Sequence, residues 1–207
     1  MILRSFFLLC LITSLSAADL VLVENGKSNY QIVVPDKSPA GAITESLSQT
    51  ARLVQTAFQA NGVAVGIVSE SQRDPAKPSL YLGDTRFARD QGIDVTTLRD
   101  WSYVLRTVGS DLIVAGHDHA AKAKSEEPRR PNWDRVGTAK AVADFVRQFM
   151  GVRFLYPEIA PYNPVGAAAK VDLLASPAIE FLPMATISVP GDLRVEKTPL
   201  LRVNTAH

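Results

Sequence analysis

The side chains best suited to chemistry gather in the tetrapeptide GHDH at residues 116–119. Imidazole and carboxylate groups are common transition-metal ligands, so His117 and His119 are the candidate metal ligands of the chain. A metal site would need a further ligand from elsewhere, and the remaining histidine, His207, stands at the end of the sequence. The alternative is a solvated loop. We expect that alternative to hold, with no bound metal and no cofactor.

Paired carboxylates would indicate glycoside hydrolysis, which needs two of them across a sugar-binding cleft. Acidic residues at the ends of expected elements are Asp84, Asp100, Asp111, Asp134 and Glu158. Such positions also suit helix caps and turns, and their spacing brings no two of them together. The sequence also has no GxSxG elbow and no phosphate-binding GxxxxGK[ST] loop. It therefore assigns no catalytic residue.

Aromatic side chains are the candidates for binding a saccharide by stacking. Trp101 and Tyr103 are two residues apart in an expected strand, so they should share one of its faces. The alternative is that both rings pack in the core or at its rim, as aromatic residues generally do.

Two amphipathic segments must position these side chains. The first begins near Ser38 and Pro39 and ends at Asn61–Gly62, with apolar residues at helical spacing. The second begins at Thr138, where we expect the N-cap, and ends at Gly151 in a left-handed conformation. On this second helix we expect the side chains of Val142, Phe145, Val146, Phe149 and Met150 to be buried and those of Lys140, Asp144, Arg147 and Gln148 to face outward.

Short β-rich runs surround the two helices. The sequence predicts a turn at Asn25–Gly26, strands at residues 63–68 and 79–84, and a hairpin formed by residues 102–108 and 111–115. This order indicates an α/β fold, an α+β sandwich in which a mixed sheet carries two main helices on one face. The strand pairs between the helices look like hairpins rather than crossovers, so we expect the helices to lie together.

The two ends of the chain differ in composition from its middle. Residues 1–18 have the basic, apolar and small-residue order of a secretory signal peptide and contain the single cysteine, Cys10. We expect one α/β domain at residues 19–157, then a proline-rich extended tail at residues 158–207. This organisation indicates a secreted or periplasmic protein with no membrane segment once the signal is removed. Lysine and arginine number 22 against 21 acidic residues, so we do not expect nucleic-acid binding.

The segment GTAKAVADFVRQFMGVRFLYP at residues 137–157, preceded by LIVAGHDH, resembles a known domain. It is similar to the N-terminal domain that precedes the barrel in family 67 alpha-glucuronidases, and to related domains of large secreted bacterial proteins. The resemblance covers roughly residues 20–205. It implies an α/β layer like the second domain of hexosaminidases, with the catalytic carboxylates supplied by a following (β/α)₈ barrel. The matching positions are Gly137, Thr138, Ala141, Val142, Asp144, Phe145, Gly151, Val152, Arg153, Phe154 and Pro157.

We therefore expect a non-catalytic N-terminal accessory domain, present as a fragment of an exported carbohydrate-active protein. Its expected partners are an oligo- or polysaccharide and the missing C-terminal catalytic barrel, because the chain ends about where that barrel should begin. Two alternatives stay open. One is a stand-alone secreted module that binds a saccharide or a protein, and the other is a small metal-dependent hydrolase built on His117 and His119.

Overall fold

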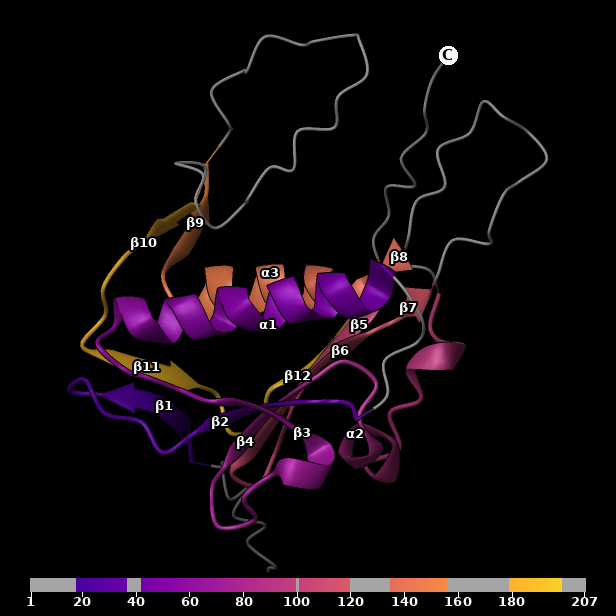
Figure 1. Cartoon of the computed structure of the whole chain (residues 1–207), viewed down its shortest axis with the longest axis horizontal. Helices are drawn as coiled ribbons and strands as arrows, with labels where there is room; N and C mark the ends of the chain where they lie inside the picture. The colour runs from indigo at the N-terminus through magenta and orange to yellow at the C-terminus, as the bar shows by residue number, and fades with distance from the viewer. Residues whose placement is uncertain (1–17, 37–41, 100, 120–134, 156–178, 199–207) are drawn as a thin grey trace, which may run out of the picture.

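The structure is a computed structural model, and it describes residues 18–36, 42–99, 101–119, 135–155 and 179–198. The expected signal peptide lies outside the described residues except for Ala18, and so do Ser38 and Pro39. A central sheet carries two long helices on one side and a short helix on the other (Figure 1). No helix among the described residues is long and apolar enough to cross a membrane.

Six strands form the central sheet in the order β12–β5–β6–β4–β2–β3 (Figure 1). The neighbours β3, β2, β4 and β6 run parallel, whereas β5 is antiparallel to both β6 and β12. The expected mixed sheet is thus confirmed, and β5 and β6 form the expected hairpin. The strands are β2 (Gln31–Val34), β3 (Ile67–Ser69), β4 (Ser79–Leu82), β5 (Tyr103–Val108), β6 (Asp111–Gly116) and β12 (Arg194–Lys197).

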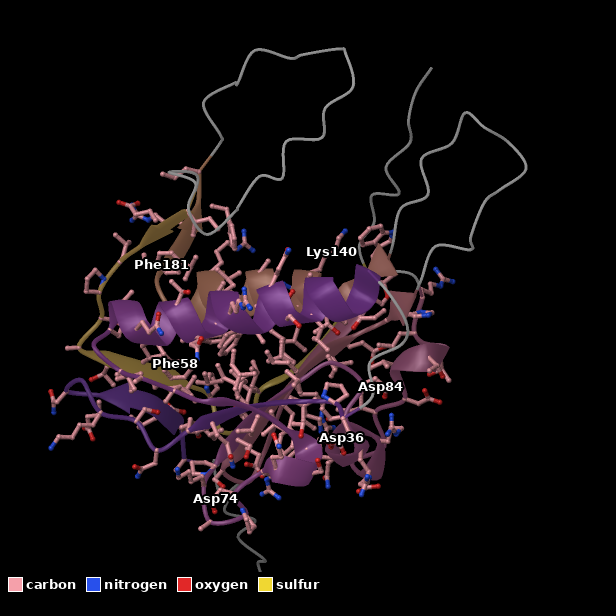
Figure 2. All side chains as sticks on the ribbon, in the orientation of Figure 1. Asp36, Phe58, Asp74, Asp84, Lys140 and Phe181 are labelled. Atoms are coloured by element: carbon pink, nitrogen blue, oxygen red, sulfur yellow. The ribbon has the colours of Figure 1, made fainter. Side chains whose placement is uncertain are left out.

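The helices α1 (Ala42–Ala60) and α3 (Gly137–Phe149) pack side by side on one face of this sheet, as expected (Figure 1). Their apolar stripes and every second residue of the strands make one core, because side chains alternate between the faces of a strand. Phe58 of α1 is among the fully buried residues, and Figure 2 shows it under the helix layer. Other members are Leu47, Val54, Val142, Phe145, Val146, Leu80, Leu82, Leu105 and Leu112.

The opposite face of the sheet is covered by short elements. The helix α2 (Arg86–Asp90) and two single 3₁₀ turns, η1 (Glu70–Gln72) and η2 (Val95–Thr97), lie there. Local hydrogen bonds hold α2 in place: Thr85 Oγ1 accepts from the Ala88 N–H, and the Glu70 carboxylate accepts from the Arg86 and Phe87 N–H groups. The Phe87 ring stacks on Tyr81 of β4 with 4.3 Å between ring centroids.

The placement of the helices is confirmed, but the expected reason for it holds only in part: β5 and β6 form a hairpin, whereas β3 and β4 do not pair because β2 lies between them. The helix α1 connects β2 to the parallel strand β3, and parallel strands require such a crossover. The β-rich runs on either side of Asn25–Gly26 also do not pair with each other. Instead β1 (Leu20–Glu24) pairs with β11 (Thr186–Val189), although Asn25 and Gly26 do form a tight turn with positive φ angles.

The second long helix follows its sequence pattern with three exceptions. Gly151 has φ +66°, so the left-handed end of α3 is confirmed. Thr138 lies inside the helix, which begins at Gly137, so the expected N-cap is wrong. Asp144 was expected to face outward, but it is 7% exposed. Phe149 is half-buried, packed against the core from its edge.

The strands that follow α3 contribute to different parts of the domain. The strand β9 (Val152–Phe154) pairs with β10 (Ile179–Phe181) as a separate ribbon and does not join the central sheet. Within the described part of the proline-rich tail, Ile187 and Val189 of β11 are fully buried, and β12 forms an edge of the central sheet. Residues 179–198 are therefore part of the folded domain rather than a chain laid over its surface.

Candidate functional site

The parallel strands end at one edge of the sheet, where α/β proteins usually bind their ligands. The strand order reverses at β2, because β3 and β4 lie on its two sides. Polar residues follow the strands there: Asp36 after β2, Asp84 after β4 and Asp118 after β6. Figure 2 shows Asp36 and Asp84 on the same side of the molecule. This carboxyl edge is the first place to look for a site.

Asp118 lies in β7 (Asp118–His119), which pairs with β8 (Arg135–Val136) directly before α3. Its carboxylate accepts a hydrogen bond from the Thr138 N–H at 2.9 Å and another from the Thr138 hydroxyl at 2.6 Å. Burial raises the pKa of Asp118, while the bonds from Thr138 lower it and nearby Asp84 adds to the rise. Asp84 and Asp118 thus lie at the same edge of the sheet, and the Asp118 carboxylate accepts hydrogen bonds from the first turn of α3.

The glycines of GHDH and GT meet at the same place. A Cβ atom on Gly116 would lie 2.2 Å from the carbonyl carbon of Gly137, and one on Gly137 would lie 2.5 Å from the His117 nitrogen. The Gly137 N–H donates to the His117 carbonyl at 3.0 Å. Backbone packs directly on backbone here, which only glycine permits.

The metal candidates are placed as follows. His117 is half-buried, and its Nδ1 atom is hydrogen-bonded to the carbonyl of Leu98. The backbone of His119 forms part of β7, and its side chain lies outside the described residues, as does His207. Among the residues that the structure describes, no group of three or more His, Cys, Asp or Glu side chains is arranged to hold a metal ion.

The saccharide candidates do not form a common platform. Tyr103 is the first residue of β5 and is 6% exposed, so its ring is closed to a ligand. Trp101 precedes the strand in a turn with φ +67°, so the two residues do not share a strand face. The ring of Trp101 is half-buried, and the Lys140 ammonium lies 4.5 Å from its centroid.

Asp144, which we expected to face solvent, is a buried carboxylate that connects the elements of this region. Asp144 accepts hydrogen bonds from the Tyr103 hydroxyl at 2.7 Å, from Lys197 at 2.6 Å and from Arg147 at 2.8 Å. Burial opposes the charged form, but the hydrogen bonds outweigh it and hold the pKa of Asp144 well below its ordinary value. Asp144 thus ties α3 to β5 and β12. The position of Asp144 directly before Phe145 of the apolar stripe was the sequence signal for its burial. A buried Tyr hydroxyl needs a hydrogen-bond partner, and Asp144 supplies one to Tyr103.

The other acidic residues have local partners. Asp84 pairs with Arg89 at 2.7 Å, Asp111 accepts from the Ser79 N–H at 2.7 Å, and Asp36 accepts from the Ser71 N–H at 2.9 Å. The expected acidic positions 100, 134 and 158 lie outside the described residues.

A hollow of about 960 Å³ opens beside β1, at the other end of the sheet. Tyr30 lines it and donates its hydroxyl hydrogen to the Ser110 carbonyl at 2.9 Å. Burial and the charge of Asp111 raise the pKa of Tyr30 to about 12, so the phenol stays neutral. The hollow is open and its lining is mixed, with Asp19, Glu24 and Lys27 among its residues.

Comparison of the sequence with protein-family models and with curated proteins gives no match. The family resemblance therefore rests on the residues quoted for it.

Proposed function

We propose that this chain is a non-catalytic accessory domain of an exported carbohydrate-active protein of the alpha-glucuronidase-like type. The observation that carries the proposal is the use of Asp118 at the carboxyl edge. Its carboxylate is bonded to both the N–H and the hydroxyl of Thr138, so it holds the start of α3. A general acid or a nucleophile must instead face the substrate.

The positions that carry the family resemblance have structural tasks, which also supports this function. Gly137 allows the backbones of α3 and β6 to touch, Asp144 anchors Tyr103, and Gly151 ends the helix with a positive φ angle. A mixed sheet with two helices on one face is the architecture that the resemblance implies. The natural partner would be a catalytic barrel, and the exported location rests on the leader at residues 1–18.

Hydrolysis assays on the purified chain test the proposal. We expect no turnover of aryl glycosides or aldouronic oligosaccharides above the background without protein. Turnover that disappears in Asp84→Asn or Asp118→Asn would overturn the accessory-domain function. The matched control is Asp94→Asn, because Asp94 is an exposed carboxylate whose hydrogen bonds stay within its own turn.

One observation favours the second candidate, a stand-alone secreted module that binds a saccharide or a protein. Trp101 keeps an unfavourable positive φ angle while its ring stays half-exposed, and backbone strain of this kind concentrates at functional sites. Calorimetry separates the two candidates. Saccharide binding without turnover by a well-behaved monomer would favour the module.

A further inference from the structure

Trp101, which has a positive φ angle, lies beside a group of cationic side chains. Lys140 contacts its ring, and Asp144 follows Lys140 by four residues, on the same side of α3. Tyr103, two residues after Trp101, donates to Asp144, and Lys197 is its direct partner in the β5–β12 register. Arg147 completes the group through its bond to Asp144. We call Trp101, Lys140, Arg147 and Lys197 the Trp101 surface.

Cationic side chains outnumber the carboxylates that they bond among the described residues of the Trp101 surface. Lys197 and Arg147 both bond to the carboxylate of Asp144, which is itself buried. The side chains of these two cations are 46% and 64% exposed, so their remaining N–H donors reach solvent. The ammonium group of Lys140 contacts the Trp101 ring. The surface therefore offers positive potential and free donors to an incoming anion.

Shape and composition indicate which kind of anion. Small-ligand sites are concave, and the hollow of about 960 Å³ beside β1 lies at the other end of the sheet from Trp101. A nucleic-acid site needs a longer basic stripe than three cations, and the whole chain has a net charge of only +1. Aromatic rings and Arg are enriched at protein–protein interfaces, and charged groups around them set which partner is attracted. We propose that the Trp101 surface docks an acidic polypeptide segment of a partner protein. This interaction goes beyond the proposed function and does not depend on it.

Fluorescence anisotropy with the full chain tests the docking. The probe is a short labelled peptide rich in glutamate, and its matched control is the same peptide with glutamine at each glutamate. We expect the glutamate peptide to bind at least about tenfold more tightly, and its affinity to fall as salt is added.

Two variants place the binding on this surface. Trp101→Gly removes the ring and suits the positive φ angle, so the fold should persist while affinity falls at least about tenfold. Lys140→Gln leaves the Trp101 ring in place. It should weaken binding of the glutamate peptide and leave binding of the glutamine peptide unchanged. The matched control is Arg153→Gln, since Arg153 is an exposed cation on β9, outside the Trp101 surface, and this change should leave binding unaltered.

Several results would overturn the docking proposal. They are no binding, equal binding of the two peptides, or equal weakening by Arg153→Gln. If a polyuronate binds with the same dependence on Trp101 and Lys140 while the peptide does not, the occupant is an acidic saccharide and the polypeptide is wrong. None of these results would by itself restore or remove the non-catalytic function, which the hydrolysis assay tests.

Discussion

The two faces of the central sheet are covered in different ways. On one face, α1 and α3 bury a continuous core in which Phe58 and Phe145 are fully enclosed. On the other face, α2 and two 3₁₀ turns cover a smaller cluster that includes Val33, Ala88 and Ile113. The difference is one of mechanism. Long-range apolar packing stabilises the helix-covered face, whereas short caps and one aromatic stack organise the opposite face.

This difference decides which substitutions should matter. On the helix-covered face, neighbouring atoms cannot shift to accommodate a side chain of a different size, because backbone and side chains are in direct contact there. On the opposite face the elements are short, and a side chain such as Phe87 is half-buried. We therefore expect a graded series of effects across the two faces.

The largest effect should come from Gly116→Ala on the helix-covered side. The new Cβ would lie 2.2 Å from backbone of Gly137, so β6 and α3 would have to separate. We expect a loss in the free energy of unfolding above the usual range of about 1–3 kcal/mol for overpacking. Urea unfolding measures it, and Gly66→Ala is the control, because nothing lies within 4 Å of its added Cβ. Equal effects of the two changes would contradict the close backbone contact.

A cavity on the helix-covered face should cost slightly less. Phe145→Ala removes a fully buried ring from α3, and we expect a loss of about 3–5 kcal/mol. Phe149→Ala on the same helix should cost clearly less, because that ring is half-buried. Phe87→Ala gives the comparison on the opposite face. If it destabilised the protein as much as Phe145→Ala, the contrast between the faces would be wrong.

The buried Asp144 should give a smaller, pH-dependent effect. Asp144→Asn weakens charged hydrogen bonds to Tyr103, Lys197 and Arg147, and we expect a loss of about 1.5–3 kcal/mol near neutral pH. The folded pKa of Asp144 lies below its ordinary value of 3.8, so its contribution is present above that value and is lost as the pH falls through the acid range. Unfolding measured from neutral pH into the acid range should show the two proteins converging. A constant difference would mean that the charge of Asp144 is not the cause.

The smallest effect should come from Tyr81 on the opposite face. Its hydroxyl is buried and has no hydrogen-bond partner among the described residues. Tyr81→Phe keeps the stack on Phe87 and removes the unpaired group, so stability should stay unchanged or rise by up to about 1 kcal/mol. Thermal unfolding checks the sign, and a clear loss would show that the hydroxyl does have a partner.

The same contrast explains what could be predicted from the sequence. The helix-covered face was predictable because residues such as Val54 and Val142 recur at helical spacing, and spacing is a local signal. The parallel pairing of β2, β3 and β4 was not, because strand direction depends on partners distant in the sequence. The pairing of β1 with β11 was missed for the same reason, since it joins residues at opposite ends of the chain.

The candidate site was only partly predictable. The GT motif was correctly interpreted as scaffold, because Gly137 packs directly on the backbone of His117. The expectation that GHDH is a solvated loop was wrong: Gly116 is buried at the end of β6, and Asp118 lies in β7 and bonds to Thr138. Asp144 was misplaced because its polar character outweighed its position next to the apolar stripe of α3. The conformation of Trp101 could not be predicted, since a positive φ angle at an aromatic residue has no sequence signal.

The central claim is that the carboxylate at the carboxyl edge of the sheet holds the fold rather than reacts with a substrate. The free energy of unfolding of Asp118→Ala tests it most directly, with Asp118→Asn as the matched control that keeps one acceptor oxygen. We predict that Asp118→Ala loses about 1 kcal/mol, because the Thr138 N–H and hydroxyl lose their acceptor, and that Asp118→Asn loses less. Functional carboxylates are often retained at a cost in stability. An Asp118→Ala protein as stable as the parent, or more stable, would contradict the structural role and indicate a site.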